Sequence, residues 1–309
     1  MNTNTIQQQL PVNEILHGDC IEAMHKMPAN SVDFILTDPP YLVNYRDRDG
    51  RTIQNDSDAS WLKPAMAEAY RVLKQDRMAI MFYGWTKADA FFDAWKSAGF
   101  QPVGHLVFRK TYSSRSRFLR YQHEQAFLLA KGRPPLPKQP LGDVMDMPYS
   151  GNKLHPTQKP VAALAPLVRS FSLAGDLVLD PFAGSGSSCA AALLTGRKYL
   201  GIEMDEAYFQ QATSRMIRVK ERISAKRSSS SFPRLVHDAC VTTCLKATSV
   251  PRCDRSCLDP RRPACSLLVI VGMNGFGHSC SCILTLLPEH FLTLQATVNA
   301  SDSHCSPMC

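Results

Sequence analysis

Four consecutive residues, Asp38, Pro39, Pro40 and Tyr41, combine groups that could prepare a base amine for attack on an electrophile. A carboxylate and a backbone carbonyl can accept the two N–H bonds of an exocyclic amine, whose lone pair is otherwise delocalised into the ring. The two prolines stiffen the segment and hold that carbonyl outward. An aromatic ring at the fourth position can stack on a base taken out of a duplex. The alternative is a Pro-Pro turn at a strand end, with Tyr41 as a packing residue.

A second group of residues is typical of a nucleoside-cofactor site. The segment from Asp180 to Gly186, DPFAGSG, follows a short apolar run and opens a helical one. Glycines let such a turn approach a ligand, and the helix behind it presents free N–H groups. Glu203 ends the next expected strand, where a carboxylate can accept hydrogen bonds from ribose hydroxyls. The G-x-G spacing disfavours a dinucleotide, which uses G-x-G-x-x-G.

Together the two motifs resemble those of the amino-group DNA methyltransferases, whose catalytic tetrapeptide is [DNS]-PP-[YFW] and whose cofactor motif is F-x-G-x-G. Two further strings match this family: HGDC at residues 17–20 and HPTQKP at residues 155–160. The resemblance covers roughly residues 13–223. The tetrapeptide precedes the glycine motif, an order similar to the β group, a circular permutation of the methyltransferase sheet. Glutamine- and ribosomal-protein methyltransferases usually carry NPPY after the glycine motif, which disfavours them.

The resemblance implies S-adenosylmethionine as the cofactor and assigns catalysis to the tetrapeptide. It places Glu203 at the ribose, Asp19 at the cofactor's adenine, and Thr157 and Lys159 on the other side of the cofactor. The full cofactor set that it implies is Asp19, Thr157, Lys159, Asp180, Phe182, Gly184, Gly186 and Glu203. Two members have simpler alternatives: Lys159 could be a solvated lysine at a helix start, and Asp19 a turn residue ahead of a helix.

Basic residues between two expected strands form a candidate phosphate-contacting patch. Its members are Arg109, Lys110, Arg115, Arg117 and Arg120. The alternative is a solvated loop. The arginines of the polar loop after the tetrapeptide could close over a flipped base; they are Arg46, Arg48 and Arg51. The family places target recognition between the two motifs, here at about residues 109–153, and the short Pro-rich stretch 131–153, which cannot form a regular element, favours a short recognition sequence.

Apolar runs that alternate with helical periodicity surround these motifs. The expected strands are 31–37, 78–83, 103–108, 125–130, 177–179 and 198–202. The expected helices are 20–26, 61–74, 86–98, 161–171, 187–194 and 205–226. This alternation predicts an α/β fold with a doubly wound, Rossmann-like sheet. By resemblance the sheet is mostly parallel with one antiparallel strand.

Composition divides the 309 residues into three parts: a flexible N-terminus at 1–12, a methyltransferase domain at 13–227, and a Cys- and Ser-rich, poorly structured tail at 228–309. Of the eleven cysteines, Cys20 and Cys189 alone precede the tail, so the domain is expected to be reduced. No apolar run reaches membrane-spanning length and no signal peptide is evident. We therefore expect a cytoplasmic protein without a membrane partner.

The expected substrate is double-stranded DNA, and the net charge of +8 suits this polyanion. Aspartate in the tetrapeptide favours the N6 amine of adenine, because serine is commoner in the N4-cytosine enzymes of this motif order. Cytosine N4 is the alternative, followed by an RNA or protein substrate and by an inactive DNA-binding homologue. No metal is expected. Dimers are common in the β group, so the resemblance allows a homodimer but the sequence leaves the oligomeric state open, and no residue indicates whether a restriction endonuclease accompanies the protein.

Overall fold

The computed structural model describes residues 10–46, 50, 52–114, 118–151, 154–244, 266–272, 279–286 and 292–296. The chain divides into two compact units, Met1–Pro233 and Arg234–Cys309, which are described separately. Most of the predicted flexible N-terminus, residues 1–9, lies outside the described residues. Among the described helices, none is both long and apolar enough to cross a lipid bilayer.

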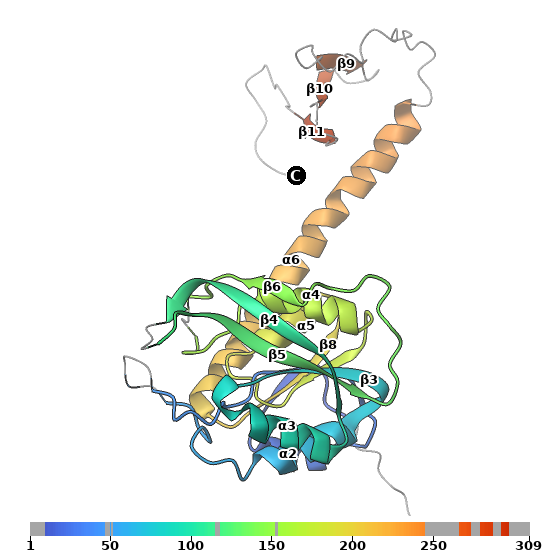
Figure 1. The fold of residues 1–309 in the computed structure, drawn as a ribbon. Helices are drawn as coiled ribbons and strands as arrows, with labels where there is room; N and C mark the ends of the chain where they lie inside the picture. The colour runs from blue at the N-terminus through green and yellow to red at the C-terminus, as the bar shows by residue number, and fades with distance from the viewer. Residues whose placement is uncertain are drawn as a thin grey trace, which may run out of the picture. The chain divides into compact units, whose positions relative to one another are not determined.

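The first unit is built on an eight-stranded sheet (Figure 1). The first half of its elements are β1 (Glu14–His17), α1 (Cys20–His25), β2 (Val32–Thr37), α2 (Leu62–Val72), β3 (Leu73–Phe82), η1 (Trp85–Lys87) and α3 (Ala88–Ala98). The second half are β4 (Gln101–Ser114), β5 (Tyr121–Lys131), β6 (Val144–Met147), α4 (Val161–Phe171), β7 (Leu177–Asp180), α5 (Ser187–Leu194), β8 (Lys198–Glu203) and α6 (Glu206–Cys244).

The strand order in this sheet is β1-β8-β7-β2-β3-β5-β4-β6. Strand β5 runs antiparallel to both of its neighbours, and every other neighbouring pair is parallel. The prediction of a mostly parallel, doubly wound sheet with one antiparallel strand is therefore confirmed.

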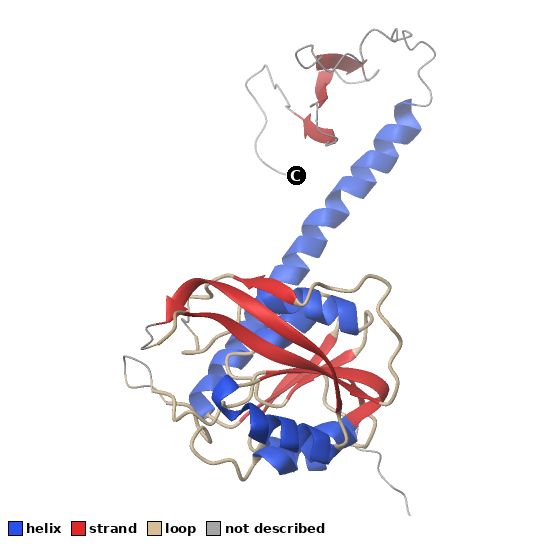
Figure 2. Cartoon of the chain, viewed as in Figure 1, coloured by secondary structure: helices blue, strands red, loops and turns tan. Residues whose placement is uncertain are grey.

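Helices cover both faces of the sheet (Figure 2). Helices α1, α2 and α3 pack on one face, in a core that contains Ile35, Met66 and Trp95. Helices α4, α5 and α6 pack on the other, in a core that contains Phe34 and Leu167. Phe34 and Ile35 are neighbours on β2 and enter different cores because successive strand residues point to opposite faces. A strand covered on both faces is buried along its whole length, as all six residues of β2 are.

The centre of the sheet positions the two motifs. Strands β2 and β7 are parallel neighbours, with Ile35 opposite Leu179. Their carboxyl ends therefore lie at the same edge, and Asp38 and Asp180 stand there side by side. Ligands of open α/β sheets bind outside this edge, so the topology itself places the two motifs at a binding site.

Four elements differ clearly from the sequence predictions. Strands β4 and β5 form a longer hairpin than expected and include much of the predicted basic loop. Strand β6 lies inside the Pro-rich stretch, where four residues free of proline pair with β4. Helix α6 continues to Cys244 rather than ending near residue 226.

The second unit contains the end of α6 and a three-stranded antiparallel sheet. Its strands are β9 (Ser266–Gly272), β10 (Ser279–Leu286) and β11 (Leu292–Ala296), in the order β11-β10-β9. The predicted poorly structured tail thus includes a helical stretch and a small sheet. The reason is that its two isolated apolar runs pair with each other, with Ile283 opposite Leu268.

Candidate active site

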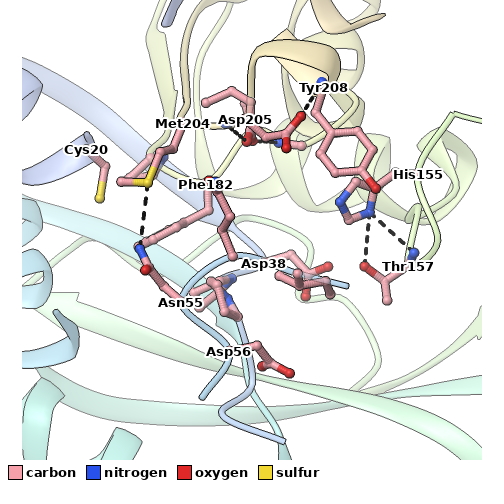
Figure 3. Close-up of a pocket in the computed structure, with 18 of the residues that line it drawn as sticks. Cys20, Asp38, Asn55, Asp56, His155, Thr157, Phe182, Met204, Asp205 and Tyr208 are labelled. Carbon is pink, nitrogen blue, oxygen red and sulfur yellow. Dashed lines mark hydrogen bonds between the residues drawn. The ribbon is translucent and has the colours of Figure 1, made fainter. Parts of the chain in front are cut away.

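An open cavity lies at the carboxyl edge of the sheet (Figure 3). Both motifs line it. The other walls come from the loop after the tetrapeptide, from the HPTQKP string and from the end of β8. The lining residues used below are Asp19, Asp38, Pro39, Tyr41, Thr157, Lys159, Asp180, Phe182, Gly184 and Glu203.

Asp38 has a specific partner on each carboxylate oxygen. The Tyr41 hydroxyl donates to Oδ1 at 2.6 Å, and the Lys159 ammonium donates to Oδ2 at 2.6 Å. Burial raises the pKa of Asp38, while the Lys159 ammonium opposes this rise. Lys159 is itself buried, so it is not a solvated lysine. It contacts the tetrapeptide, where the sequence had predicted a cofactor contact.

Tyr41 is fixed by close packing. A Cβ built on Gly84 would lie only 2.8 Å from the Tyr41 Cβ, so only glycine fits after β3 at this point. The Lys159 ammonium lies 3.2 Å from the Tyr41 hydroxyl and 5.4 Å from the centre of its ring. Burial, Asp38 and Glu124 raise the pKa of Tyr41 well above its usual range. The phenol therefore stays protonated and can donate to Asp38.

A buried ion pair that the sequence did not predict lies beside the tetrapeptide. Lys110 on β4 donates to Glu124 on β5 at 3.0 Å, and Lys110 is only 7% exposed. Burial raises the pKa of Glu124, but the Lys159 and Lys110 ammonium groups outweigh it and lower that pKa overall. Lys110 thus does not lie on the surface with the predicted phosphate contacts. Strand alternation gives the reason, because Lys110 shares a face with the fully buried Phe108.

Asp180 joins the ends of the two central strands. Its Oδ1 accepts the Thr37 hydroxyl at 2.7 Å and the Phe182 N–H at 3.1 Å. Burial raises the pKa of Asp180 to about 7, so the carboxyl titrates near neutral pH. The Phe182 ring packs against Trp61, with 5.1 Å between ring centres. The glycine motif is thereby held against the loop that follows Tyr41.

The glycine turn and Glu203 form a polar cradle. Gly184 adopts a left-handed φ of +51° and donates its N–H to Glu203 Oε2 at 2.7 Å. The Asp205 N–H donates to Oε1 at 2.9 Å. Each carboxylate oxygen has two acceptor positions, so each keeps capacity for a hydroxyl on the cavity side. Burial raises the pKa of Glu203. This donor and acceptor set fits the diol of a nucleoside.

The family model for DNA methylases matches residues 32–214, which include both motifs and all of the central strands. The chain belongs to this DNA methylase family. The methylase YubD of Escherichia coli (strain K12) is 54% identical over 209 residues, which cover 68% of this chain and 92% of YubD. The DNA adenine methyltransferase YhdJ of the same strain is 32% identical over 244 residues, which cover 65% of this chain and 82% of YhdJ.

Solved structures share the fold of this DNA methylase. The M1.HpyAVI–SAM complex matches with a TM-score of 0.54 and 23% identity, over 66% of this chain and 98% of that chain. The cytosine-N4-specific PvuII DNA methyltransferase matches with a TM-score of 0.55 and 16% identity, over 68% of this chain and 91% of that chain. These similarities support the doubly wound architecture.

Of three other residues predicted to bind the cofactor, two line the cavity and one does not. Asp19 lines the cavity and also caps α1, because its Oδ1 accepts the N–H groups of Ile21 and Glu22 at 2.8 and 3.0 Å. Thr157 lines the cavity with its hydroxyl 3.1 Å from His155 Nδ1. Gly186 is not among the lining residues; with φ of +73° it caps α5 and donates its N–H to the Ala183 carbonyl.

The predicted DNA-contacting arginines fall into two groups. Arg46, Arg109 and Arg120 are exposed. Arg46 forms an isolated bridge with Thr52, and Arg109 pairs with Asp146 on β6 at 2.8 Å. The remaining arginines lie outside the described residues; they are Arg48, Arg51, Arg115 and Arg117.

Proposed function

We propose that this methylase transfers a methyl group from S-adenosylmethionine to the exocyclic N6 amine of adenine at specific sites in DNA. The observation that carries the proposal is the shared cavity, where Asp38 lies beside the glycine turn and its Glu203 partner. Similarity to the adenine methyltransferase YhdJ favours adenine. The order of the motifs supports assignment to the β group of the family.

The residues of the cavity have proposed roles either at the base amine or at the cofactor. Asp38 and the Pro39 carbonyl accept the two N–H bonds of the amine, which favours its nucleophilic form, and Tyr41 stacks on the extruded base. Glu203 binds the ribose hydroxyls. Asp19 reaches the cofactor's adenine, and the remaining contacts come from Thr157, Lys159, Asp180, Phe182 and Gly184, while Gly186 shapes the turn at the start of α5. When bound, S-adenosylmethionine supplies an electrophilic methyl group. Much of the rate enhancement comes from holding amine and methyl group in line.

We further propose that the partner is double-stranded DNA, contacted by Arg46, Arg109 and Arg120, together with Arg115 and Arg117. The methyltransferase domain spans 13–227, with target recognition at about 109–153. A homodimer and a cytoplasmic location complete the proposal.

Cytosine N4 is the second candidate target, because its exocyclic amine presents the same two N–H donors to Asp38. The PvuII enzyme with this fold is cytosine-N4-specific by name. The identity of the methylated nucleoside therefore decides between the two target bases.

The deciding experiment incubates the purified protein with tritiated S-adenosylmethionine and unmethylated bacterial DNA, followed by nucleoside mass spectrometry. We expect label in DNA and N6-methyladenine as the product. N4-methylcytosine would replace adenine as the target. An absence of label in DNA, with label in RNA or protein substrates instead, would overturn the proposal.

Replacing Lys159 with methionine is expected to move the acidic limb of the pH–rate profile to higher pH. Ionised Asp38 accepts N–H bonds on both oxygens, whereas protonation turns one oxygen into a donor. The Lys159 ammonium opposes the rise in the pKa of Asp38. Without this cation the carboxyl retains its proton at higher pH, so activity is lost earlier as the pH falls. Tritium transfer measured from roughly pH 5 to 9 tests this.

The matched control is Lys63→Met, which removes an exposed lysine that pairs with Asp93 away from the cavity. Its acidic limb should coincide with that of the wild type. An unmoved limb in Lys159→Met would show that Lys159 does not control the charge of Asp38.

A further inference from the structure

The tip of the β4–β5 hairpin exposes two large apolar side chains. Phe118 is 91% exposed and Leu119 is 66% exposed. Phe118 is the most exposed large apolar residue in the part of the chain that the structure describes. Neither side chain contributes to a core cluster of the sheet. A pair of this size at a projecting tip suits contact with another molecule.

The hairpin projects from the same edge of the sheet that opens into the cavity. Strand β3 ends there at Phe82, which lies opposite Ala126 of β5. Strand β5 begins five positions before Ala126, at Tyr121. The hairpin therefore extends about 16 Å beyond the edge before its tip is reached. In Figure 1 the two strands run out together past the end of β3.

A line of contacts connects the tip with the tetrapeptide. Gly84 packs directly on Tyr41, and the next residue, Trp85, is 59% exposed. The Trp85 ring lies 5.9 Å from the ring of Tyr121, the first residue of β5. Aromatic surface thus leads from the base-stacking tyrosine to the hairpin tip.

The charge around the tip favours a nucleic acid as the partner. Arg120 follows Leu119 directly and is exposed. Arg109 is also exposed on the same hairpin, opposite His123. Cations beside an apolar tip match a phosphate backbone with stacked bases inside it.

We propose that Phe118, supported by Leu119, inserts between the bases of duplex DNA and occupies the space that the extruded target base leaves in the stack. This inference rests on the proposed function, because it deepens how that site obtains its base. Extrusion costs the base its stacking and pairing, and an inserted apolar ring replaces part of the lost stacking. This insertion, the Phe118 wedge, is needed only for paired DNA, since single strands present unstacked bases.

The test compares tritium transfer to unmethylated duplex DNA and to the same DNA after heat denaturation. We expect Phe118→Ala to lose about tenfold or more on duplex DNA and to stay within about twofold of wild type on single strands. Leu119→Ala should show a smaller loss of the same kind. Binding of S-adenosylmethionine should be unchanged in both variants.

The matched control is Leu173→Ala, outside the proposed target-recognition segment. Leu173 is 67% exposed, and its N–H bonds Asp176, which directly precedes β7 at the edge of the sheet opposite the cavity. Its activity on both DNAs should equal that of wild type. Equal losses of Phe118→Ala on duplex and single strands, or no loss on duplex, would overturn the wedge.

A second measurement does not depend on catalysis. Phe118→Trp and Leu173→Trp each add one indole to the same background, and excess duplex DNA is titrated into both. Stacking between bases should quench the added emission at position 118 but not at position 173. Absence of quenching at 118 would contradict insertion. If wild type labels neither DNA, the proposed function fails and this titration still decides the wedge.

Discussion

Replacing Asp38 with alanine is expected to lower methyl transfer to DNA by about 100- to 1,000-fold or more, because the variant loses an acceptor aimed at the reacting amine. Binding of S-adenosylmethionine should change little, since Asp38 is not among the residues proposed to contact the cofactor. Tritium transfer gives the rate, and isothermal titration calorimetry gives the cofactor affinity. The separation between these two effects is the signature of a residue that acts on the amine.

Two further variants define what Asp38 supplies. Asp38→Asn keeps the size of the side chain and one acceptor oxygen but turns the other position into a donor, so its rate should lie between those of alanine and wild type. Asp58→Ala removes an exposed carboxylate of the following loop, whose partner is Ser60, and should retain activity. Wild-type rates in Asp38→Ala would show that the tetrapeptide is a structural turn.

Replacing Glu203 with glutamine is expected to weaken S-adenosylmethionine binding by about 10- to 100-fold, the value of a hydrogen bond to a charged group. The side chain keeps its shape, but one oxygen becomes a donor that opposes either the Gly184 N–H or the Asp205 N–H. The loss should appear in the cofactor Kd and KM, with a much smaller effect on the rate at saturation.

Glu206→Gln is the control for this variant. Glu206 lies near Glu203 in sequence, pairs with His17 on the surface and is not among the lining residues. Its cofactor affinity should match that of wild type. Unchanged affinity in Glu203→Gln would remove the carboxylate from the cofactor site.

The centre of the site could be predicted from sequence because local patterns determine it. Strand β2 ends at Thr37, just before Asp38 and the two prolines, and a glycine turn follows the apolar run of β7. Parallel neighbours must bring such ends to one edge, so pairing β2 with β7 places Asp38 next to Asp180. The same logic predicted the acidic end of β8 beside Gly184.

The other features of the site depend on contacts between residues far apart in the sequence, which local patterns do not predict. Lys110 has the sequence context of a surface cation, and only the pairing of β4 with β5 reveals that it is buried against Glu124. Lys159 precedes a helix, yet its ammonium crosses the cavity to Asp38. The length of the hairpin could not be predicted either, because its outer half is polar and is held by strand pairing.

The most direct test is a crystal structure of this methylase with S-adenosylhomocysteine. The ribose hydroxyls should contact Glu203, and the sulfur should face the Asp38 carboxylate across the open edge between β2 and β7. Density for the ligand elsewhere on the chain, or a sulfur directed away from Asp38, would contradict the idea that the two strand ends serve one reaction.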